Sequence, residues 1–545
     1  MKPNVKIYRN NDQAIIVWNY ESVIENCIGF AVFRQLNNES PDLAEPLKNR
    51  VGFADEPFVK GQQKPSTEWP IQRFLWTDYS LQVGDKAKYK IVPILLNSGE
   101  LVKDNENSSD WSEEIEAVTG DKYQAFFNRG IVSSQFYSRN IADVSSDVHN
   151  KTLKAVLEDD NKLRRILGGY LATKLFSLLE EIRGNTALTV FGALYELHQE
   201  DLIEKLKEIK DRANIILANG AAKGSSEDKN ADSRAEIKDA GVNVHDRIVG
   251  TGHFAHNKFL VICENNIPKR VWSGSTNWTP GGMFTQLNNG LLIEDQDVAQ
   301  KYLDEWHKLE AAGSGYPDDL FDFNAESRTS GDDIKIWFNP TAEQGDLNDV
   351  KELMDAAKDG ILFLMFNPGP KGTLFNKILE LQQQKPDLMI HGIANQDPGG
   401  KEPLIFFNNG AKDTANWSTL LPKRIEKEFA FWFAEKSGGL VNIHSKVLVI
   451  DPFSEKPYVV TGSNNLGPKA SGKNDENLLI IQNKKLAEEY AVHITGAYQH
   501  YRWRYSLFNK HSDFKGLTKD TNWMTTYLTD NTKKELEFWL GSKGD

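Results

Sequence analysis

The chain has 545 residues, of which 39% are hydrophobic and 26% are charged, and its formal net charge is −13. One hydrophobic core rarely serves more than about 250–300 residues, so this length predicts about two to four globular domains. The sequence contains neither the apolar core of a signal peptide nor a run of about 18 apolar residues, so we expect no secretion signal and no membrane span. The negative charge disfavours a protein that coats nucleic acid or anionic membranes, but it is compatible with a local basic cleft.

The cysteine content is low. Cys27 and Cys263 are too few for a disulfide framework or a cysteine zinc site. They fit a reducing compartment. We therefore expect a cytoplasmic location, or export by a route that needs no signal peptide. No spacing typical of a metal site is found, so we predict neither a metal nor a cofactor.

Residues 1–119 have the pattern of an all-β domain. Apolar residues alternate with polar ones in four runs, and stretches that contain Gly and Pro separate the runs. This pattern predicts a β-sandwich. The runs are Ala14–Tyr20, Gly29–Arg34, Arg73–Tyr79 and Ala87–Leu95.

Four residues of this segment resemble the hallmarks of a fibronectin type III domain. Trp18 lies in an early predicted strand, and Leu81, Gly84 and Tyr89 resemble the leucine–glycine–tyrosine corner of that family. The corner here carries extra residues and lacks its usual proline, so another small β-sandwich is the alternative. Such a domain would serve as an adaptor for a protein partner or a surface, or as a rigid wall beside a site.

From residue 120 onward the pattern changes to alternating strands and helices, and it occurs twice. This alternation predicts two α/β halves, at 120–325 and 326–545, each a sheet with helices packed on it. The variable segments Ala221–Glu236 and Gln396–Trp417 are candidate substrate-selecting loops, although the first could equally be a solvated insertion. The first series is Tyr123–Phe127, Gly169–Ile182, Ala187–Leu194, Leu202–Asp211 and Asn214–Ala218, and the second is Ile334–Phe338, Leu347–Lys358, Ile361–Phe366, Thr373–Gln383 and Leu388–Ile393.

Each half also contains the same short motif. In the first half, His256 and Lys258 precede an apolar run, and a Gly-Ser-Thr-Asn turn ends at Asn277. In the second half, His444 and Lys446 precede an apolar run, and a Gly-Ser-Asn-Asn turn ends at Asn465. The spacing from His to Gly is eighteen residues in both copies. Such a repeat predicts two similar halves around one site.

The residue types of the motif predict a site for an anion. Residues i and i+2 of a strand point to one face, so His256 and Lys258 project together, as do His444 and Lys446. A histidine beside a lysine is electrostatically unfavourable unless an anion lies between them. Two such pairs suit a phosphate group. Behind the Gly-Ser turns, whose serines are Ser275 and Ser463, Asn277 and Asn465 could donate hydrogen bonds to phosphoryl oxygens.

The doubled motif resembles the phospholipase D superfamily, and the resemblance covers roughly residues 120–510. It implies a phosphodiesterase that works through a covalent phosphohistidine and without a metal. The N-terminal histidine of that family is usually the nucleophile, so the resemblance assigns this role to His256 and the general acid and base role to His444. Lys258 and Lys446, with the two asparagines of the turns, would stabilise charge on the phosphoryl oxygens.

The family also places a polar residue downstream of each motif, where it bonds to the histidine of the other half. Glu476 lies thirty-two residues after His444, and Asn288 lies thirty-two residues after His256. Crosswise pairing would bring Glu476 to His256, and Asn288 or Asn289 to His444. We also expect Ser275, Ser463, Asn288 and Asn289 to contact the substrate. The carboxylate would then fix the tautomer of the nucleophile.

The two copies differ at the residue that ends the apolar run. The family has Asp there, and Asp451 matches it, whereas the first copy has Cys263. This position lies beyond the buried run and away from the catalytic face. We therefore interpret Cys263 as a local packing change and not as a reactive thiol.

The sequence discriminates poorly between substrates. A phospholipid is slightly favoured, because the net charge disfavours a nuclease and no basic tail is present. The alternative is a nuclease that acts on DNA or RNA by the same mechanism, and a second alternative is a non-catalytic binding protein on the duplicated fold. Hydrolysis and transfer to an alcohol stay equally open. Both motifs lie in one chain, so a monomer is expected.

Overall fold

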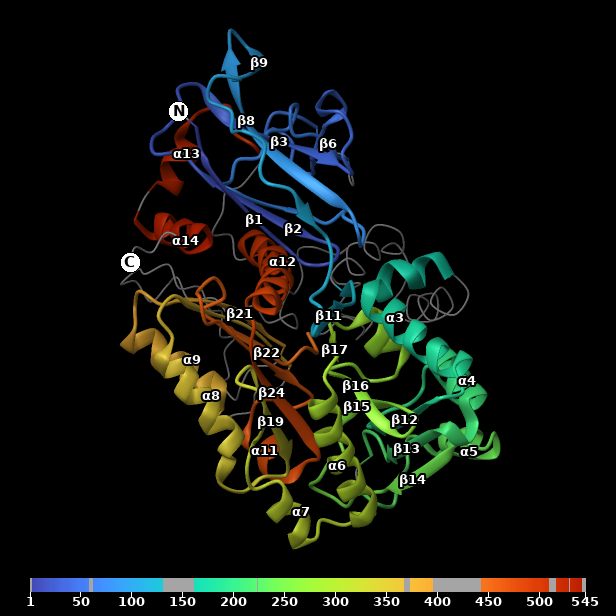
Figure 1. Ribbon diagram of the computed structural model, residues 1–545. Coiled ribbons are helices and arrows are strands. Elements are labelled where there is room, and N and C mark those ends of the chain that lie inside the picture. Colours follow the sequence, from blue (N-terminus) through green and yellow to red (C-terminus); the bar gives the residue numbers. More distant parts are fainter. Residues whose placement is uncertain are drawn as a thin grey trace.

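The structure is a computed structural model that describes residues 2–57, 62–130, 161–222, 224–366, 373–395, 443–508, 516–528 and 530–541. Figure 1 shows a β-rich N-terminal region above two α/β halves, with the long helix α12 (Lys484–Phe508) between the upper and lower parts. The expectation of a β-rich region followed by two α/β halves is confirmed. Among the helices in these ranges, none is both long and apolar enough to cross a bilayer.

The N-terminal region contains two main sheets, with strand order β1-β2-β7 in one and β10-β8-β3-β4 in the other, and β9 pairs with β8. A small hairpin, β5 with β6, lies beside them. The strands are β1 Asn4–Arg9, β2 Ala14–Asn19, β3 Cys27–Leu36, β4 Glu45–Pro46, β5 Lys48–Asn49, β6 Lys64–Pro65, β7 Leu75–Asp78, β8 Lys86–Asn97, β9 Glu100–Lys103 and β10 Ile115–Glu116, and a 3₁₀ turn covers Pro41–Leu43.

All four runs predicted as strands in this region are strands, but the sequence reading missed β1. This strand lies at the edge of its sheet and pairs only with β2. Its residues are largely exposed or half-buried. An edge strand with an exposed face needs few apolar residues, so its pattern is weak.

The predicted corner between β7 and β8 is well ordered by hydrogen bonds. The Tyr89 hydroxyl donates to Asp78 Oδ2 at 3.0 Å, and Leu81 is fully buried. Gly84 has a φ of +86°, in the region that favours glycine, and its N–H donates to the Ala117 carbonyl at 2.9 Å. The first contact holds β8 against the end of β7. The second ties the corner to Ala117, which lies near the end of the N-terminal region.

Each α/β half contains a seven-stranded sheet, and six strands of one sheet match six of the other in order. The orders are β11-β17-β16-β15-β12-β13-β14 and β18-β19-β24-β23-β22-β20-β21. The first sheet has β14 in addition, and the second has β18. The strands are β11 Tyr123–Phe127, β12 Leu188–Leu194, β13 Ala213–Ala218, β14 Asn243–Arg247, β15 Lys258–Glu264, β16 Ile267–Gly274, β17 Asn289–Ile293, β18 Arg328–Ser330, β19 Ile334–Asn339, β20 Gly360–Met365, β21 Met389–Ala394, β22 Val447–Ile450, β23 Tyr458–Gly462 and β24 Glu476–Gln482.

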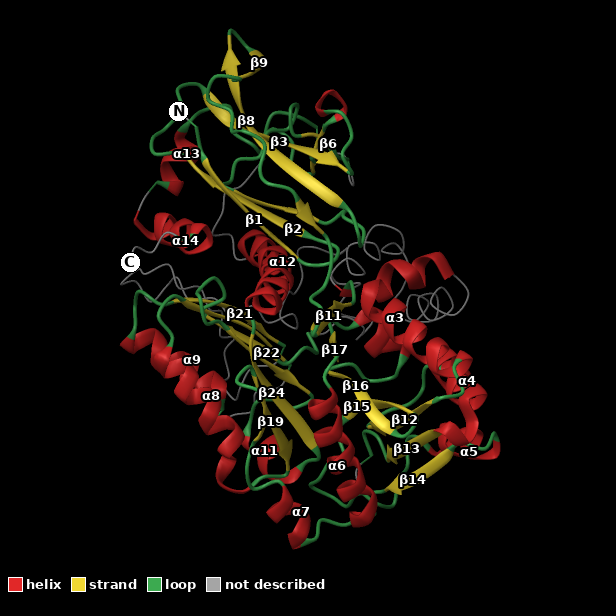
Figure 2. Ribbon diagram, in the orientation of Figure 1, coloured by secondary structure: helices red, strands yellow, loops and turns green. Residues whose placement is uncertain are grey.

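The helices cover these sheets, as Figure 2 shows. Every predicted helix of the two series is present, and three of the four lie within two residues of their expected bounds, whereas α3 begins at Asn161, eight residues before its expected start. α4, for example, buries Leu202, Ile203, Leu206 and Ile209, which form one face at helical spacing. The helices are α3 Asn161–Gly184, α4 Glu200–Ile209, α5 Ala231–Asp239, α6 Gln296–Ala312, α7 Asp318–Phe323, α8 Gly345–Ala356, α9 Leu374–Gln384, α11 Pro468–Lys473, α12 Lys484–Phe508, α13 Asn522–Tyr527 and α14 Asp530–Leu540, with short helical turns at Lys210–Arg212, Gly281–Thr285 and Ala342–Gln344.

Helix α12 joins the three parts of the molecule into one core. It contacts β1 and β2 of the N-terminal region, β11 of the first half, and β20 to β23 of the second half. Its buried residues include Tyr490, Ile494 and Tyr498, which belong to a continuous apolar cluster with the N-terminal sheets. The N-terminal region is therefore packed against the α/β halves through this helix.

The C-terminal segment returns to the N-terminal region. The Trp523 ring packs on Phe30 and Phe74, with centroids 5.7 and 5.9 Å away. The Leu517 N–H donates to the carbonyl of Gly52 at 2.8 Å. Residues 516–528 and 530–541, which the sequence pattern places in the second half, thus contribute to the apolar core of the first region.

Candidate active site

The segment that carries each His-x-Lys motif runs alongside the opposite half. The His256 backbone N–H donates to the carbonyl of Asp475 at 2.9 Å. The His444 backbone N–H donates to the carbonyl of Leu287 at 2.9 Å. Isolated parallel bridges form at both places. Each histidine therefore lies next to the start of a strand from the other sheet, β24 or β17.

The side chains of the two histidines continue this crosswise arrangement. Nδ1 of His256 lies 2.7 Å from Oε2 of Glu476. Nδ1 of His444 lies 2.9 Å from Oδ1 of Asn288. Of the two asparagines considered from the sequence, Asn288 contacts the histidine, and Asn289 does not. In each imidazole one ring nitrogen is thus engaged by the opposite half, and Nε2 is left for other contacts.

The histidines lie just before their strands and not within them, which differs from the expectation. β15 begins at Lys258 and β22 begins at Val447. The backbone of His256 and His444 is hydrogen-bonded to the opposite half, so it does not join the ladder of its own sheet. This placement puts both side chains at the boundary between the sheets.

The two lysines have matching environments. Nζ of Lys258 donates to the carbonyl of His256 at 2.5 Å, and Nζ of Lys446 donates to the carbonyl of His444 at 2.5 Å. Nζ of Lys446 also lies 3.2 Å from Nε2 of His444. All four side chains are buried. Each motif thus folds its ammonium group back toward its own histidine.

An aromatic ring lies under each ammonium group. Nζ of Lys258 is 4.8 Å from the ring centroid of Tyr195, and Nζ of Lys446 is 4.8 Å from that of Phe366. Tyr195 follows β12 and Phe366 follows β20, which are matching strands of the two sheets. These cation–π contacts partly compensate the burial of each charge.

The Gly-Ser turns depend on glycine. Gly274 and Gly462 have φ values of +143° and +140°. A Cβ at either position would lie 2.4 or 2.3 Å from the carbonyl oxygen of Asn289 or Asn477, respectively. Only glycine allows this close approach of two strands.

The serines of these turns are fully buried. Their hydroxyl groups bond to asparagines of the neighbouring chain segment. Ser275 Oγ donates to Asn288 Oδ1 at 2.7 Å, the atom that also faces His444. Ser463 Oγ accepts from the N–H of Asn477 at 3.0 Å. The sequence predicts Ser275 and Ser463 as substrate contacts. In the structure their hydroxyl groups bond to Asn288 and Asn477, respectively.

Asn289 connects the two halves. Its Nδ2 donates to Thr461 Oγ1 at 3.0 Å and to the Tyr490 hydroxyl at 2.9 Å, both in the second half. Asn477 makes a related contact in the other direction, because its Oδ1 accepts from Ser273 Oγ at 2.8 Å. Asn289 was predicted to contact substrate, but its amide is used in this connection.

The asparagines that end the turns differ in their partners. Nδ2 of Asn277 donates to Oε2 of Glu196 at 2.6 Å. Oδ1 of Asn277 and Oδ1 of Asn465 are buried, and neither has a hydrogen-bond partner in the ranges that the structure describes. Sequence reasoning missed Glu196. The available signal was a charged residue directly after a buried strand, where site residues often lie.

The comparison with protein families gives a clear result. Residues 181–309 and 350–497, together just over half of the chain, match the family model described as "Cardiolipin synthase, PLD-like domain". The chain belongs to this PLD-like family. The expectation of a phospholipase D superfamily member, drawn from the doubled motif, is confirmed. No curated protein matches the chain.

Several solved structures resemble this PLD-like chain at low identity. Phosphatidylserine synthase from Haemophilus influenzae Rd KW20 is 12% identical with a TM-score of 0.40, over 59% of this chain and 84% of that one. Polyphosphate kinase from Porphyromonas gingivalis is 10% identical with a TM-score of 0.39, over 87% and 74%. The phospholipase D family member Nuc from Salmonella typhimurium is 17% identical with a TM-score of 0.21, over 26% and 89%.

Burial and neighbouring cations keep both histidines of the PLD-like site neutral. Burial, followed by Lys258 and Lys446, lowers the pKa of His256 well below its usual value. Burial lowers the pKa of His444 in the same way, with further contributions from Lys446 and Lys258. A neutral imidazole that donates Nδ1–H to Glu476 has its lone pair on Nε2, which is the form of a nucleophile.

The lysines and Glu476 are also shifted by burial. The pKa of Lys258 is lowered to about 7 by burial, against the carboxylates of Glu476 and Glu196. Burial, and then the charge of Lys258, lowers the pKa of Lys446 well below its usual value. Burial raises the pKa of Glu476 to about 8, against the attraction of Lys258. An anion between the lysines would favour their charged forms.

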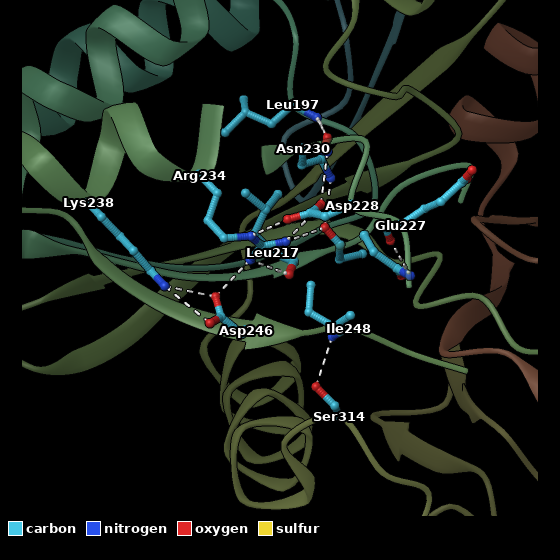
Figure 3. Close-up of polar contacts among 12 residues, drawn as sticks. Leu197, Leu217, Glu227, Asp228, Asn230, Arg234, Lys238, Asp246, Ile248 and Ser314 are labelled. Carbon is cyan, nitrogen blue, oxygen red and sulfur yellow. Dashed lines mark hydrogen bonds and ion pairs between the residues drawn. The ribbon is translucent and has the colours of Figure 1, made fainter. Parts of the chain in front are cut away.

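The first variable segment of the PLD-like fold is an ordered structure in Figure 3. Arg234 bonds Asp228 at 2.7 Å and Asp246 at 2.9 Å. Asn230 Nδ2 donates to the Tyr195 carbonyl at 2.9 Å. Through Asn230, the segment therefore supports the backbone of Tyr195, whose ring lies under the ammonium group of Lys258. The other candidate loop, 396–417, lies outside the described residues.

The difference between Cys263 and Asp451 is confined to the far ends of their strands. Oδ1 of Asp451 accepts from the N–H groups of Lys358, Asp359 and Gly360 at 3.1, 2.7 and 3.0 Å. Cys263 is buried, and burial raises the pKa of its thiol to about 11. Such a thiol is not activated at neutral pH.

Within the part of the chain that the structure describes, no three His, Cys, Asp or Glu side chains converge as a metal site. The functional groups that do converge are imidazole, ammonium, amide and carboxylate. Such a set can bind a phosphoryl group and move protons.

Proposed function

We propose that this protein is a phosphodiesterase of the phospholipase D type, which needs no metal and forms a covalent phosphohistidine. One observation carries the proposal: the two buried histidines are each oriented at Nδ1 by the opposite half, His256 by Glu476 and His444 by Asn288. Membership of the PLD-like family supports it. Paired and oriented imidazoles suit an attack followed by proton transfer.

In the first step, Nε2 of His256 attacks phosphorus and forms a P–N bond. The P–O bond to the leaving alcohol breaks, and its oxygen takes a proton from His444, which enters this step as an imidazolium because the bound diester anion favours the charged form. In the second step, His444 removes a proton from water or an acceptor alcohol, whose oxygen attacks phosphorus and releases His256. Glu476 stabilises the charged phosphoimidazole, whereas the neutral amide of Asn288 cannot take the proton of His444.

The phosphoryl oxygens would be held by Lys258 and Lys446, with Asn277 and Asn465 as additional donors. Preorganised donors of this kind contribute about 10²–10³-fold each to the rate. One lysine and one asparagine come from each half. The two halves would therefore surround the phosphoryl group in a nearly symmetric way.

The mechanism is tested with bis(p-nitrophenyl) phosphate. His256→Ala and His444→Ala should each reduce turnover by at least about 10²–10⁴-fold, with or without EDTA. His307→Ala is the matched control, because this exposed histidine lies on α6 away from the site. Near-normal activity in either site variant would refute the two-histidine mechanism, and loss of wild-type activity in EDTA would indicate a metal enzyme.

Within this mechanism we favour a phospholipid substrate. The description of the matching family and the net charge of −13 support it. A nuclease is the second candidate, favoured by the half-buried ring of Phe254, which lies two residues before His256 and under Nζ of Lys469 at 4.3 Å. Incubation with phosphatidylcholine vesicles and with single- and double-stranded DNA separates the two, and added ethanol distinguishes transfer from hydrolysis.

We interpret the N-terminal region as a fibronectin type III-like adaptor within residues 1–119. Two sheets with the orders β1-β2-β7 and β10-β8-β3-β4 support this interpretation, as does the Tyr89 hydroxyl bonded to Asp78. We also propose a monomer, because one chain supplies both motifs, and size-exclusion chromatography with light scattering tests this.

A further inference from the structure

Glu196 is a carboxylate of the site, and the matching position in the sequence of the second half is an asparagine. It follows Tyr195 at the end of β12, and its Oε2 accepts from Nδ2 of Asn277 at 2.6 Å. In the second half, Phe366 takes the place of Tyr195, and the sequence continues with Asn367. The two copies of the sequence thus differ in charge at this position.

The backbone around Glu196 is held from several directions. Asn230 accepts from the N–H of Leu197 at 3.1 Å and donates to the carbonyl of Tyr195 at 2.9 Å. The N–H of Trp278 donates to the carbonyl of Glu196 at 3.2 Å. Figure 3 shows Asn230 and Leu197 in this contact. Both neighbours of Glu196 are fixed, so its carboxylate is preorganised.

The amide of Asn277 needs this carboxylate. Its Oδ1 is buried and has no hydrogen-bond partner among the described residues, which is unfavourable for a buried polar atom. The bond from Nδ2 to Glu196 therefore determines which way the amide points. One N–H of Nδ2 is used by Glu196, and the other is left for a phosphoryl oxygen.

Glu196 also lies among charged and titratable groups. Lys258 and His198 attract its negative charge, whereas burial raises its pKa. Burial, followed by the negative charges of Glu196 and Glu476, raises the pKa of Tyr195. Burial lowers the pKa of Lys258, and the negative charges of Glu476 and Glu196 oppose this lowering. Removal of the Glu196 charge should therefore lower the pKa of Lys258.

We propose that Glu196 is a positioning residue of this phosphoryl-transfer site, which orients the amide of Asn277 and whose charge favours the ammonium form of Lys258. This inference rests on the proposed phosphodiesterase function. Glu196 acts through Asn277 and Lys258 and makes no bond to the reacting phosphorus.

The test compares Glu196→Ala and Glu196→Gln with wild type on bis(p-nitrophenyl) phosphate between pH 5 and 10. We expect Glu196→Ala to lower kcat by roughly tenfold or more, less than the loss for removing a donor itself. Glu196→Gln keeps an acceptor for Asn277, so it should recover much of kcat. Without the carboxylate, Lys258 loses its proton at lower pH, so both variants should lose activity at a lower pH than wild type.

Glu200→Gln is the matched control, because this exposed carboxylate lies in the first turn of α4, four residues away. It should leave the pH profile unchanged. Wild-type rates and profiles in both Glu196 variants would overturn the inference. Equal losses of kcat in both, with an unshifted profile and a lower Tm, would overturn it in favour of a purely structural role.

Binding of inorganic phosphate gives the same readout without turnover. Calorimetry over the same pH range should show that phosphate affinity falls at a lower pH in Glu196→Gln than in wild type, and coincident curves would overturn the inference. Wild-type protein that binds phosphate but does not turn over diester would refute the proposed function alone. The two failures are therefore distinguishable.

Discussion

Nδ1 of His256 lies 2.7 Å from Oε2 of Glu476, a residue that belongs to the opposite sheet. The corresponding contact of His444 is made by an amide, that of Asn288, at 2.9 Å. One imidazole is thus oriented by a group that can carry negative charge and the other by a neutral group. Under the proposed mechanism this asymmetry assigns the nucleophile to His256, because phosphorylation at Nε2 leaves its imidazole positively charged while Nδ1 keeps its proton.

Replacement of Glu476 tests this distinction. We expect Glu476→Gln to lower kcat by about 10²-fold or more with little change in KM, because the amide cannot stabilise a charged imidazole as a carboxylate does. Asn288→Ala should lower kcat less, since His444 loses orientation but no opposing charge. Steady-state kinetics on a chromogenic diester measures both, and a smaller loss in Glu476→Gln than in Asn288→Ala would contradict the assignment.

The covalent intermediate should be found on His256. A reaction stopped with denaturant at alkaline pH, where phosphohistidine survives, is digested and analysed by mass spectrometry. The peptide that contains His256 should carry the phosphoryl adduct, and the adduct should be absent from His256→Ala. An adduct found only on the peptide that contains His444 would reverse the two roles.

Activity should depend on pH through Lys258. In the free protein its pKa is lowered to about 7 by burial, so the charged form is lost as the pH rises through neutrality. A bound diester anion favours the ammonium form and raises this pKa. The alkaline decline of kcat/KM, which reports the free enzyme, should therefore occur at lower pH than that of kcat. Coincident declines would show that substrate does not contact this charge.

The ends of the two motif strands should differ in their contribution to stability. Asp451→Ala removes an acceptor from the N–H groups of Lys358, Asp359 and Gly360 and should lower the free energy of unfolding by about 2–3 kcal/mol. Asp451→Asn keeps a residue that tolerates the φ of +49° and should lose less. Cys263→Ala should keep full activity. Denaturant unfolding measures the stability of the two Asp451 variants, and steady-state kinetics measures the activity of Cys263→Ala. An inactive Cys263→Ala would contradict the interpretation of Cys263 as a packing residue.

Trp523 should stabilise the N-terminal region although it lies near the other end of the chain. Trp523→Ala removes a ring that packs on Phe30 and Phe74, so we expect a loss of about 3–5 kcal/mol. Thermal unfolding followed by tryptophan fluorescence measures it. The exposed and distant Leu43 provides the control, Leu43→Ala, which should have little effect. Equal Tm values for Trp523→Ala and wild type would show that the C-terminal segment does not contribute to this core.

Much of the fold could be predicted because its signals are local. Alternating strands and helices gave both α/β series within a few residues, apart from the start of α3, since apolar periodicity follows directly from side-chain geometry. The edge strand β1 (Asn4–Arg9) was missed because its exposed face weakens that periodicity. The placement of the C-terminal segment against Phe30 was also missed, because no local pattern records a contact between distant parts of the chain.

Glu196 shows the same limit within the site. A single glutamate after a strand has no distinguishing pattern, and its importance appears only when the turn that ends at Asn277 folds against it. The sequence also placed the two histidines within strands. Their backbone instead bonds to Asp475 and Leu287 of the opposite halves, an outcome that depends on how the sheets meet.

By itself, the sequence determined the duplication, the kinds of element in each half and the paired imidazoles and ammonium groups, because all of these are written in local patterns and in one repeated spacing. Only the tertiary structure decided that Asn288 and not Asn289 faces His444, and that Asn277 bonds to Glu196. Adjacent residues of a strand point to opposite faces. Which face meets the other half depends on the packing of the two sheets, and no local pattern encodes that.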